Sequence, residues 1–119
     1  MQPSGAWLRV SHVNINPVRY KRDTVQQFIY NYKPHVLGIT ETWLDPTVSL
    51  TSLAIEDYVI VRCDRGLRSN RSLINGAPRY VQGGGVAFYL HISLEYKVLH
   101  MSSIRHIAET EYLILEILV

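Results

Sequence analysis

A strand–helix–strand pattern at the start of the sequence constrains the fold more than any other feature. From Trp7 to Asn16 apolar and polar residues partly alternate, which is typical of a strand with one buried face. From Val18 to Tyr32 the apolar residues fall at helical spacing, and the following Lys-Pro pair is expected to end the helix. The apolar run Val36–Thr40 then predicts a buried strand. Two strands joined by a helix are expected to lie parallel, so the chain is predicted to be an α/β protein.

The rest of the chain is expected to be mostly β structure. Strands are predicted at residues 58–62, 86–90, 94–100 and 111–119, and the polar stretch 64–82 is expected to be a basic loop. The last predicted strand is almost wholly apolar and reaches the end of the sequence. Because such a strand would lack a partner, we expect the chain to be part of a larger protein and to fold poorly alone.

Composition limits the classes of function. The chain has 119 residues, of which 47% are hydrophobic, enough for one domain spanning residues 1–119. A net charge of +2 and a sequence pI of about 8.8 are too weakly basic to imply nucleic-acid binding by themselves. The single cysteine, Cys63, excludes an internal disulfide, and the sequence shows neither a secretory signal nor an apolar run of about 18 residues. We therefore expect an intracellular protein, nuclear or cytoplasmic, without a membrane span.

Two polar residues follow the first two predicted strands. Glu41 comes directly after Val36–Thr40, and Asn14 closes the earlier apolar run. In α/β proteins ligands gather at the carboxyl ends of strands, and Mg²⁺ is usually held by one or two carboxylates with water and phosphate oxygens. Glu41 is therefore a candidate metal ligand, and Asn14 could bind the metal or a phosphate. The alternatives are a solvated acid for Glu41 and an ordinary turn for Asn14, since Pro17 follows closely.

Several other groups carry weaker signals. The arginines after the third predicted strand could follow a nucleic-acid backbone or could simply be solvated; they are Arg62, Arg65, Arg68, Arg71 and Arg79. Residues 83–85, three glycines, precede a strand and lack a P-loop lysine, so a flexible turn is favoured over a phosphate cradle. The five histidines lack the spacing of a zinc site. Glu109, Glu111 and Glu116 are candidate second carboxylates, or polar residues that border a core strand.

Four segments, in order, resemble the motifs of the endonuclease/exonuclease/phosphatase family, within it the endonuclease domain of non-LTR (LINE-like) retrotransposon polyproteins, which precedes the reverse transcriptase. Residues 12–19 are similar to the first motif and residues 37–44, with Glu-Thr-Trp-Leu, to the second. Residues 83–90 are similar to the glycine-led strand that follows, and residues 111–117 to the next core strand.

The resemblance implies a fold, an activity and a site. The implied fold is the amino-terminal part of a four-layer α/β/β/α sandwich, incomplete in this chain. The implied activity is Mg²⁺-dependent hydrolysis of phosphodiester bonds in DNA, with Mn²⁺ as an alternative metal. Glu41 and Asn14 take the places of the family's metal and phosphate residues, with Glu41 as a direct metal ligand.

The sequence also departs from the family pattern. The later Gly-Asp-Phe-Asn and Ser-Asp-His motifs, and the tyrosine strand between them, are absent from the sequence. Removing members of a catalytic unit usually abolishes most of its rate, so we expect this chain to be inactive alone. Two other functions stay open: a non-catalytic remnant of a decayed mobile element that at most binds nucleic acid weakly, and a phosphatase relative that shares the metal site.

Overall fold

The computed structural model describes residues 7–15, 18, 21–44, 47–64, 84–102 and 112–118. Within them lie the strands β1 (Val10–Val13), β2 (Val36–Thr40), β3 (Tyr58–Cys63), β4 (Val86–His91), β5 (Glu95–Met101) and β6 (Leu113–Leu118). The helix α1 (Arg22–Tyr32) and the short 3-10 helix η2 (Thr51–Leu53) complete the described elements. All the predicted strands are therefore confirmed, although β1 is shorter than the predicted segment from Trp7 to Asn16.

The predicted strand–helix–strand unit is present and its strands are parallel. β1 pairs with β2 in register from Val10 opposite Val36 to Val13 opposite Ile39. β2 then pairs antiparallel with β4, and β4 with β3, which gives the four-stranded order β1-β2-β4-β3. β5 and β6 form a separate antiparallel sheet, with an irregularity between Val98 and His100.

The helix differs from its prediction at its amino end. α1 begins at Arg22 rather than at Val18, which lies buried before the helix. It ends at Tyr32, as predicted; Lys33 is left-handed (φ 46°), and its N–H donates to the carbonyl of Ile29. This left-handed cap ends the hydrogen-bond ladder and turns the chain toward β2. The predicted apolar stripe is narrower than expected, because the Tyr32 side chain is 63% exposed.

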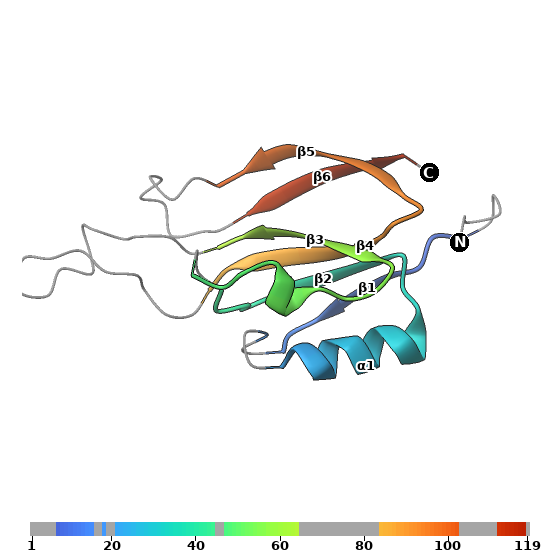
Figure 1. Cartoon of the computed structure of the whole chain (residues 1–119). Helices are drawn as coiled ribbons and strands as arrows, with labels where there is room; N and C mark the ends of the chain where they lie inside the picture. Colours follow the sequence, from blue (N-terminus) through green and yellow to red (C-terminus); the bar gives the residue numbers. More distant parts are fainter. Residues whose placement is uncertain are drawn as a thin grey trace, which may run out of the picture.

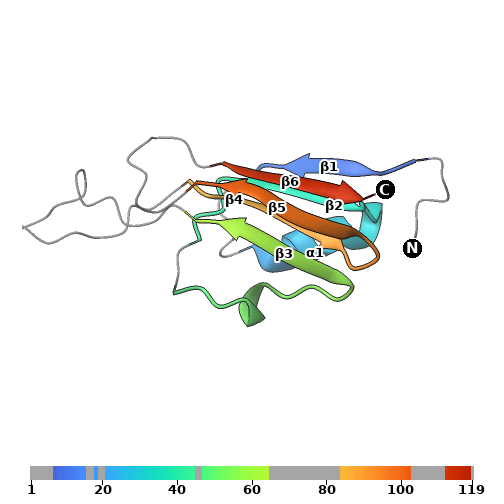
Figure 2. The same cartoon turned by 90° about the horizontal axis from the view of Figure 1, so that it is seen from above.

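Three layers are stacked, with α1 on one face of the four-stranded sheet and the β5–β6 sheet on the other (Figures 1 and 2). Alternate residues of β2 therefore enter different cores: Leu37 and Ile39 pack with Val25 and Ile29 of α1, whereas Val36 packs in the core between the sheets. This double burial explains the unbroken apolar run of β2.

The carboxyl ends of β1 and β2 and the amino end of β4 meet at one edge of the sheet, at the left in Figure 1. Glu41 and Asn14 leave their strands at this edge. The opposite edge carries the end of α1 and the start of β2. Among the described residues, no helix is long and apolar enough to cross a bilayer.

Candidate active site

The chain makes a strained corner directly after β2. Glu41 and Trp43 both have left-handed backbones, with φ of 56° and 57°. This conformation is unfavourable for residues with a side chain, by roughly 1–2 kcal/mol each, and it is unusual for a bulky aromatic. Such strain persists only where the surrounding structure enforces it, and it concentrates at functional sites.

The glycine run before β4 enforces this corner. Beyond the last regular pair, Thr40 with Val86, the two segments stay joined: Thr42 N–H donates to the Gly85 carbonyl (3.4 Å) and Trp43 N–H to the Gly84 carbonyl (2.9 Å). Gly84 and Gly85 are themselves left-handed, with φ of 69° and 86°, which glycine adopts without steric cost. The glycines therefore form a buried support for the corner rather than the flexible turn favoured by the sequence; Gly83 lies outside the described residues.

The Glu41 carboxylate is half-buried and held by two N–H donors. The Trp43 indole Nε1–H donates to Oε2 at 3.3 Å, and the Gly84 backbone N–H donates to the same oxygen at 3.2 Å. Within the described part of the chain, no further hydrogen bond to this carboxylate is formed, so Oε1 keeps its coordinating capacity. Glu41 is therefore an oriented acid at a strand end, not a freely solvated one.

Asn14 lies beside this corner but is less constrained. It follows Val13, which is paired with Ile39, so Asn14 and Glu41 leave neighbouring parallel strands within one or two residues of the last pair. Its side chain is exposed. An amide and a carboxylate at one sheet edge fit the donors that Mg²⁺ takes when water and substrate phosphates complete its shell. Among the residues described, no group of three or more His, Cys, Asp or Glu side chains could hold a metal ion.

His12 and Thr40 add polar groups that the sequence interpretation missed. The Thr40 hydroxyl and the His12 Nε2 lie 3.4 Å apart, between the ends of β1 and β2. In the sequence, His12 is only one of the five histidines that lack the spacing of a zinc site. The two-residue period of a strand could have singled it out, because residues 12 and 14 lie on the same side of β1.

The structure excludes Arg62 as a free phosphate-binding cation. Its guanidinium is paired with Asp64 (Nη2 to Oδ2, 2.6 Å) and also donates to the Val48 carbonyl at 2.8 Å. Both side chains of the pair are about 90% buried, with 14% and 12% exposed. Arg65, Arg68 and Arg71, the other predicted nucleic-acid contacts, lie outside the described residues, as does Arg79.

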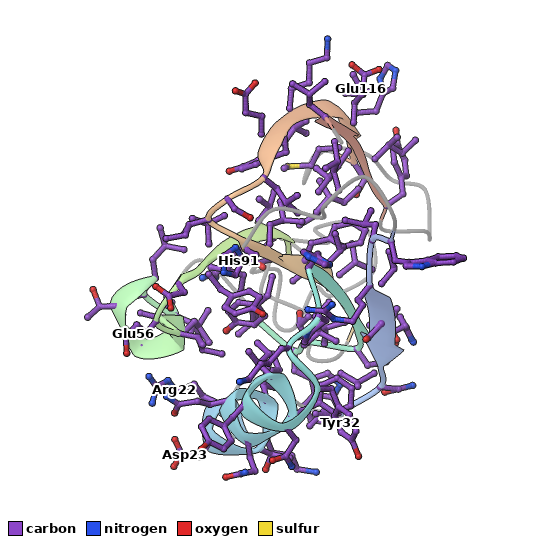
Figure 3. All side chains as sticks on the ribbon, turned by 90° about the vertical axis from the view of Figure 1, so that its right-hand side faces the viewer. Arg22, Asp23, Tyr32, Glu56, His91 and Glu116 are labelled. Atoms are coloured by element: carbon purple, nitrogen blue, oxygen red, sulfur yellow. The ribbon has the colours of Figure 1, made fainter. Side chains whose placement is uncertain are left out.

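The candidate second carboxylates do not join the site where they are described. Glu116 is exposed on the β5–β6 sheet and pairs with Lys97 at 3.0 Å (Figure 3). Glu109 and Glu111 lie outside the described residues. Cys63 is buried, and its thiol contacts the Ser102 hydroxyl at 3.0 Å.

A groove of about 380 Å³ lies at the other end of the sheet, between α1 and the turn before β3. Arg9 and Lys33 line it together with Glu56, Asp57 and His91; Glu56 and His91 are labelled in Figure 3. The cations and anions offset one another, so the groove shows no preference for an anionic substrate. The candidate site is therefore placed at the strand ends, on the chemistry of Glu41 and Asn14, and not in this groove.

Comparison with known proteins supports the fold. The chain is similar to the crystal structure of the AP endonuclease LMAP from Leishmania major, with 15% identity and a TM-score of 0.55. That match covers 92% of this chain and 34% of the other. A second match, to an AP endonuclease from Archaeoglobus fulgidus, has 16% identity and a TM-score of 0.49 over 81% of this chain and 30% of the other. The chain thus spans about a third of the length of either structure.

The fold is that of part of an endonuclease/exonuclease/phosphatase domain, as predicted. Three of the four layers of the sandwich are present among the described residues. No protein-family model matches the sequence, and no curated protein is significantly similar to it. At this level of identity the comparison shows the fold alone.

Proposed function

We propose that the chain is part of a Mg²⁺-dependent DNA endonuclease of the non-LTR retrotransposon type. The observation that carries this proposal is the Glu41 carboxylate, oriented by two N–H donors at the carboxyl end of β2 and beside the end of β1. The sequence motifs favour a retrotransposon enzyme within the fold. The similar crystal structure of the AP endonuclease LMAP is consistent with a nuclease.

Glu41 and Asn14 are proposed to have different roles at the strand ends. Glu41 would hold the metal through Oε1, since Oε2 already accepts two hydrogen bonds. Asn14 would hold the metal through its amide oxygen or donate its N–H to a phosphate oxygen of the substrate. When bound, Mg²⁺ supplies electrostatic stabilisation of charge that develops on the scissile phosphate and the leaving oxygen.

This chain alone is proposed to be inactive. The resemblance assigns the orientation of water, the leaving-group contact and phosphate binding to the Gly-Asp-Phe-Asn and Ser-Asp-His motifs, which the sequence lacks. Such groups act as a unit. Asn14 and Glu41 would therefore bind the metal, but without the missing motifs DNA hydrolysis would not reach a normal rate. Nicking of supercoiled DNA at an ordinary enzymatic rate by the purified 119-residue chain would contradict this part of the proposal.

Metal binding tests the site itself. Titration of the chain with Mg²⁺, followed by amide NMR, should shift resonances around Asn14, Glu41 and Gly84. Glu41→Gln removes the charge but keeps the shape, and it should abolish the shifts. Glu116→Gln is a matched control, because this carboxylate lies on the second sheet, and it should leave them unchanged. Shifts that persist in Glu41→Gln would overturn the proposed metal site.

A non-catalytic remnant that binds nucleic acid weakly is the second candidate. The feature that favours it is the basic polar stretch with Arg65, Arg68, Arg71 and Arg79. Its arginines in residues 65–71 would give weak, salt-sensitive binding without metal. DNA binding that is insensitive to Mg²⁺ and unchanged in Glu41→Gln would support this candidate over the enzyme.

A further inference from the structure

We infer that Trp43 is a positioning residue, which aims the Glu41 carboxylate by donating its indole N–H to one carboxylate oxygen and leaving the other for a cation. This inference rests on the proposed metal site. It goes further by giving a role to a residue that never touches the metal. It also explains why an aromatic side chain occupies an unfavourable backbone conformation at this corner.

The hydrogen bonds show which oxygen is held. Both the Trp43 indole and the Gly84 backbone N–H donate to Oε2, and neither donates to Oε1. A carboxylate that rotates freely would present either oxygen, but two donors on one atom select a single orientation. Groups that orient a metal ligand in this way typically alter metal affinity by about 10- to 100-fold when they are removed.

The two donors come from different parts of the fold. Trp43 is two residues along the chain from Glu41, so its position depends on the left-handed corner. Gly84 is 43 residues away in sequence and reaches the carboxylate only because β4 pairs with β2. The Trp43 backbone N–H also donates to the Gly84 carbonyl at 2.9 Å, which joins both donors in one unit.

The backbone strain supports a role for the indole. A bulky residue at φ 57° is unfavourable by roughly 1–2 kcal/mol, and glycine or asparagine would occupy that position more easily. The indole is only half-buried, so burial of apolar surface is a weak reason for the strain. Its polar edge faces the one acid of the candidate site.

The chain offers a matched control, because its two tryptophans differ in environment. Trp7 is 81% exposed and has no place in the site, so Trp7→Phe should behave like the parent protein. Trp43→Phe keeps an aromatic ring and removes the Nε1–H donor. Manganese binding, measured as free Mn²⁺ by electron paramagnetic resonance, should be about tenfold weaker in Trp43→Phe and unchanged in Trp7→Phe.

A second measurement leaves Trp43 intact and therefore does not depend on whether Trp43→Phe folds. In Trp7→Phe, the single indole N–H resonance belongs to Trp43. It should shift on addition of Mg²⁺, together with the Gly84 amide, and it should also shift when Glu41→Gln is introduced.

The outcomes separate the inference from the proposed function. Loss of binding in Glu41→Gln with unchanged binding in Trp43→Phe would overturn the role of Trp43 and leave the metal site standing. If saturating Mg²⁺ shifts the Gly84 amide but leaves the Trp43 indole resonance unchanged, the role of Trp43 would also be overturned. Absence of Mn²⁺ binding by the parent chain would overturn the metal site and the inference together.

Discussion

His35 is a buried histidine whose neutral ring is held in one tautomer. Its side chain is 1% exposed, and Nδ1 accepts a hydrogen bond from the Arg9 backbone N–H at 2.9 Å. The ring proton of the neutral form therefore sits on Nε2, which has no partner among the described residues. Burial lowers the pKa of His35 below its ordinary value of 6.5, and the Arg9 guanidinium lowers it further.

This environment predicts a stability that falls in acid. Because the folded pKa of His35 lies below the unfolded pKa, the unfolded chain binds the proton more readily. The stabilisation is complete above about pH 6.5 and is lost as the pH falls below that value. Urea denaturation should therefore give a lower free energy of unfolding at pH 5.5 than at pH 7.5.

A variant identifies the source of this pH effect. His35→Asn keeps a side-chain acceptor for the Arg9 amide but does not titrate, so the difference between the two pH values should shrink. Burial also lowers the pKa of His91, which accounts for a remainder of the same sign. An undiminished difference in His35→Asn would contradict the assignment.

The same substitution, glycine to alanine, should change the free energy of unfolding by different amounts at Gly85 and at Gly38. Gly85 has φ of 86°, where a side chain is strained, so Gly85→Ala should lower the free energy of unfolding by about 1–2 kcal/mol. Gly38 lies within β2, and an added Cβ would meet Phe88 Cε1 at 3.4 Å and His12 Cδ2 at 3.5 Å, close to ordinary contact. Gly38→Ala should change stability by less than about 1 kcal/mol. Thermal unfolding of both variants tests this, and equal losses would contradict it.

At the scale of elements, Arg62 connects the end of β3 to the segment after β2, because it pairs with Asp64 and also donates to the Val48 carbonyl. Arg62 binds Asp64 in a bidentate manner and reaches the Val48 carbonyl, while both charges are largely removed from water. Asp64→Asn leaves the guanidinium without its counter-charge, so it should destabilise the chain by about 2 kcal/mol.

Glu116→Gln supplies the contrast, because the Lys97–Glu116 pair is 68% and 59% exposed. Exposed pairs contribute little, so this change should stay within about 0.5 kcal/mol. Chemical denaturation of both variants measures the difference. Equal losses in the free energy of unfolding would mean that the buried Arg62–Asp64 pair stabilises the chain no more than the exposed pair does.

At the scale of the whole molecule, the layers are expected to differ in local stability. β2 lies between two cores and pairs with a strand on each side, whereas every residue of β5 is exposed. Amide hydrogen exchange should therefore be slowest in β2 and β4 and fastest in β5. Uniform protection across both sheets would contradict this order.

The expectation that the chain folds poorly alone stays a prediction. Apolar side chains of the β5–β6 sheet are exposed, among them Ile114 at 46% and Leu118 at 67%. Such exposure favours association and weakens cooperativity. A single cooperative thermal transition together with a monomeric, monodisperse elution profile would contradict the expectation.

Much of the fold was predictable because its signals are local. The alternation before β1, the helical spacing of Val25 and Ile29, and the apolar run of β2 each report the environment of one element. The parallel pairing of β1 and β2 followed from their connection. The narrower apolar stripe of α1 was not predictable, since the exposure of Tyr32 depends on packing against residues distant in sequence.

The sequence by itself determined the order of elements and the placement of Glu41 and Asn14 after neighbouring strands, because strand and turn patterns are written in adjacent residues. Only the tertiary structure decided what surrounds Glu41. The Gly84 donor is distant in sequence, and the indole donor depends on two left-handed residues that no apolar pattern reveals. The contact of Arg62 with the Val48 carbonyl, 14 residues away, was decided in the same way, whereas its carboxylate partner Asp64 is only two residues along the chain.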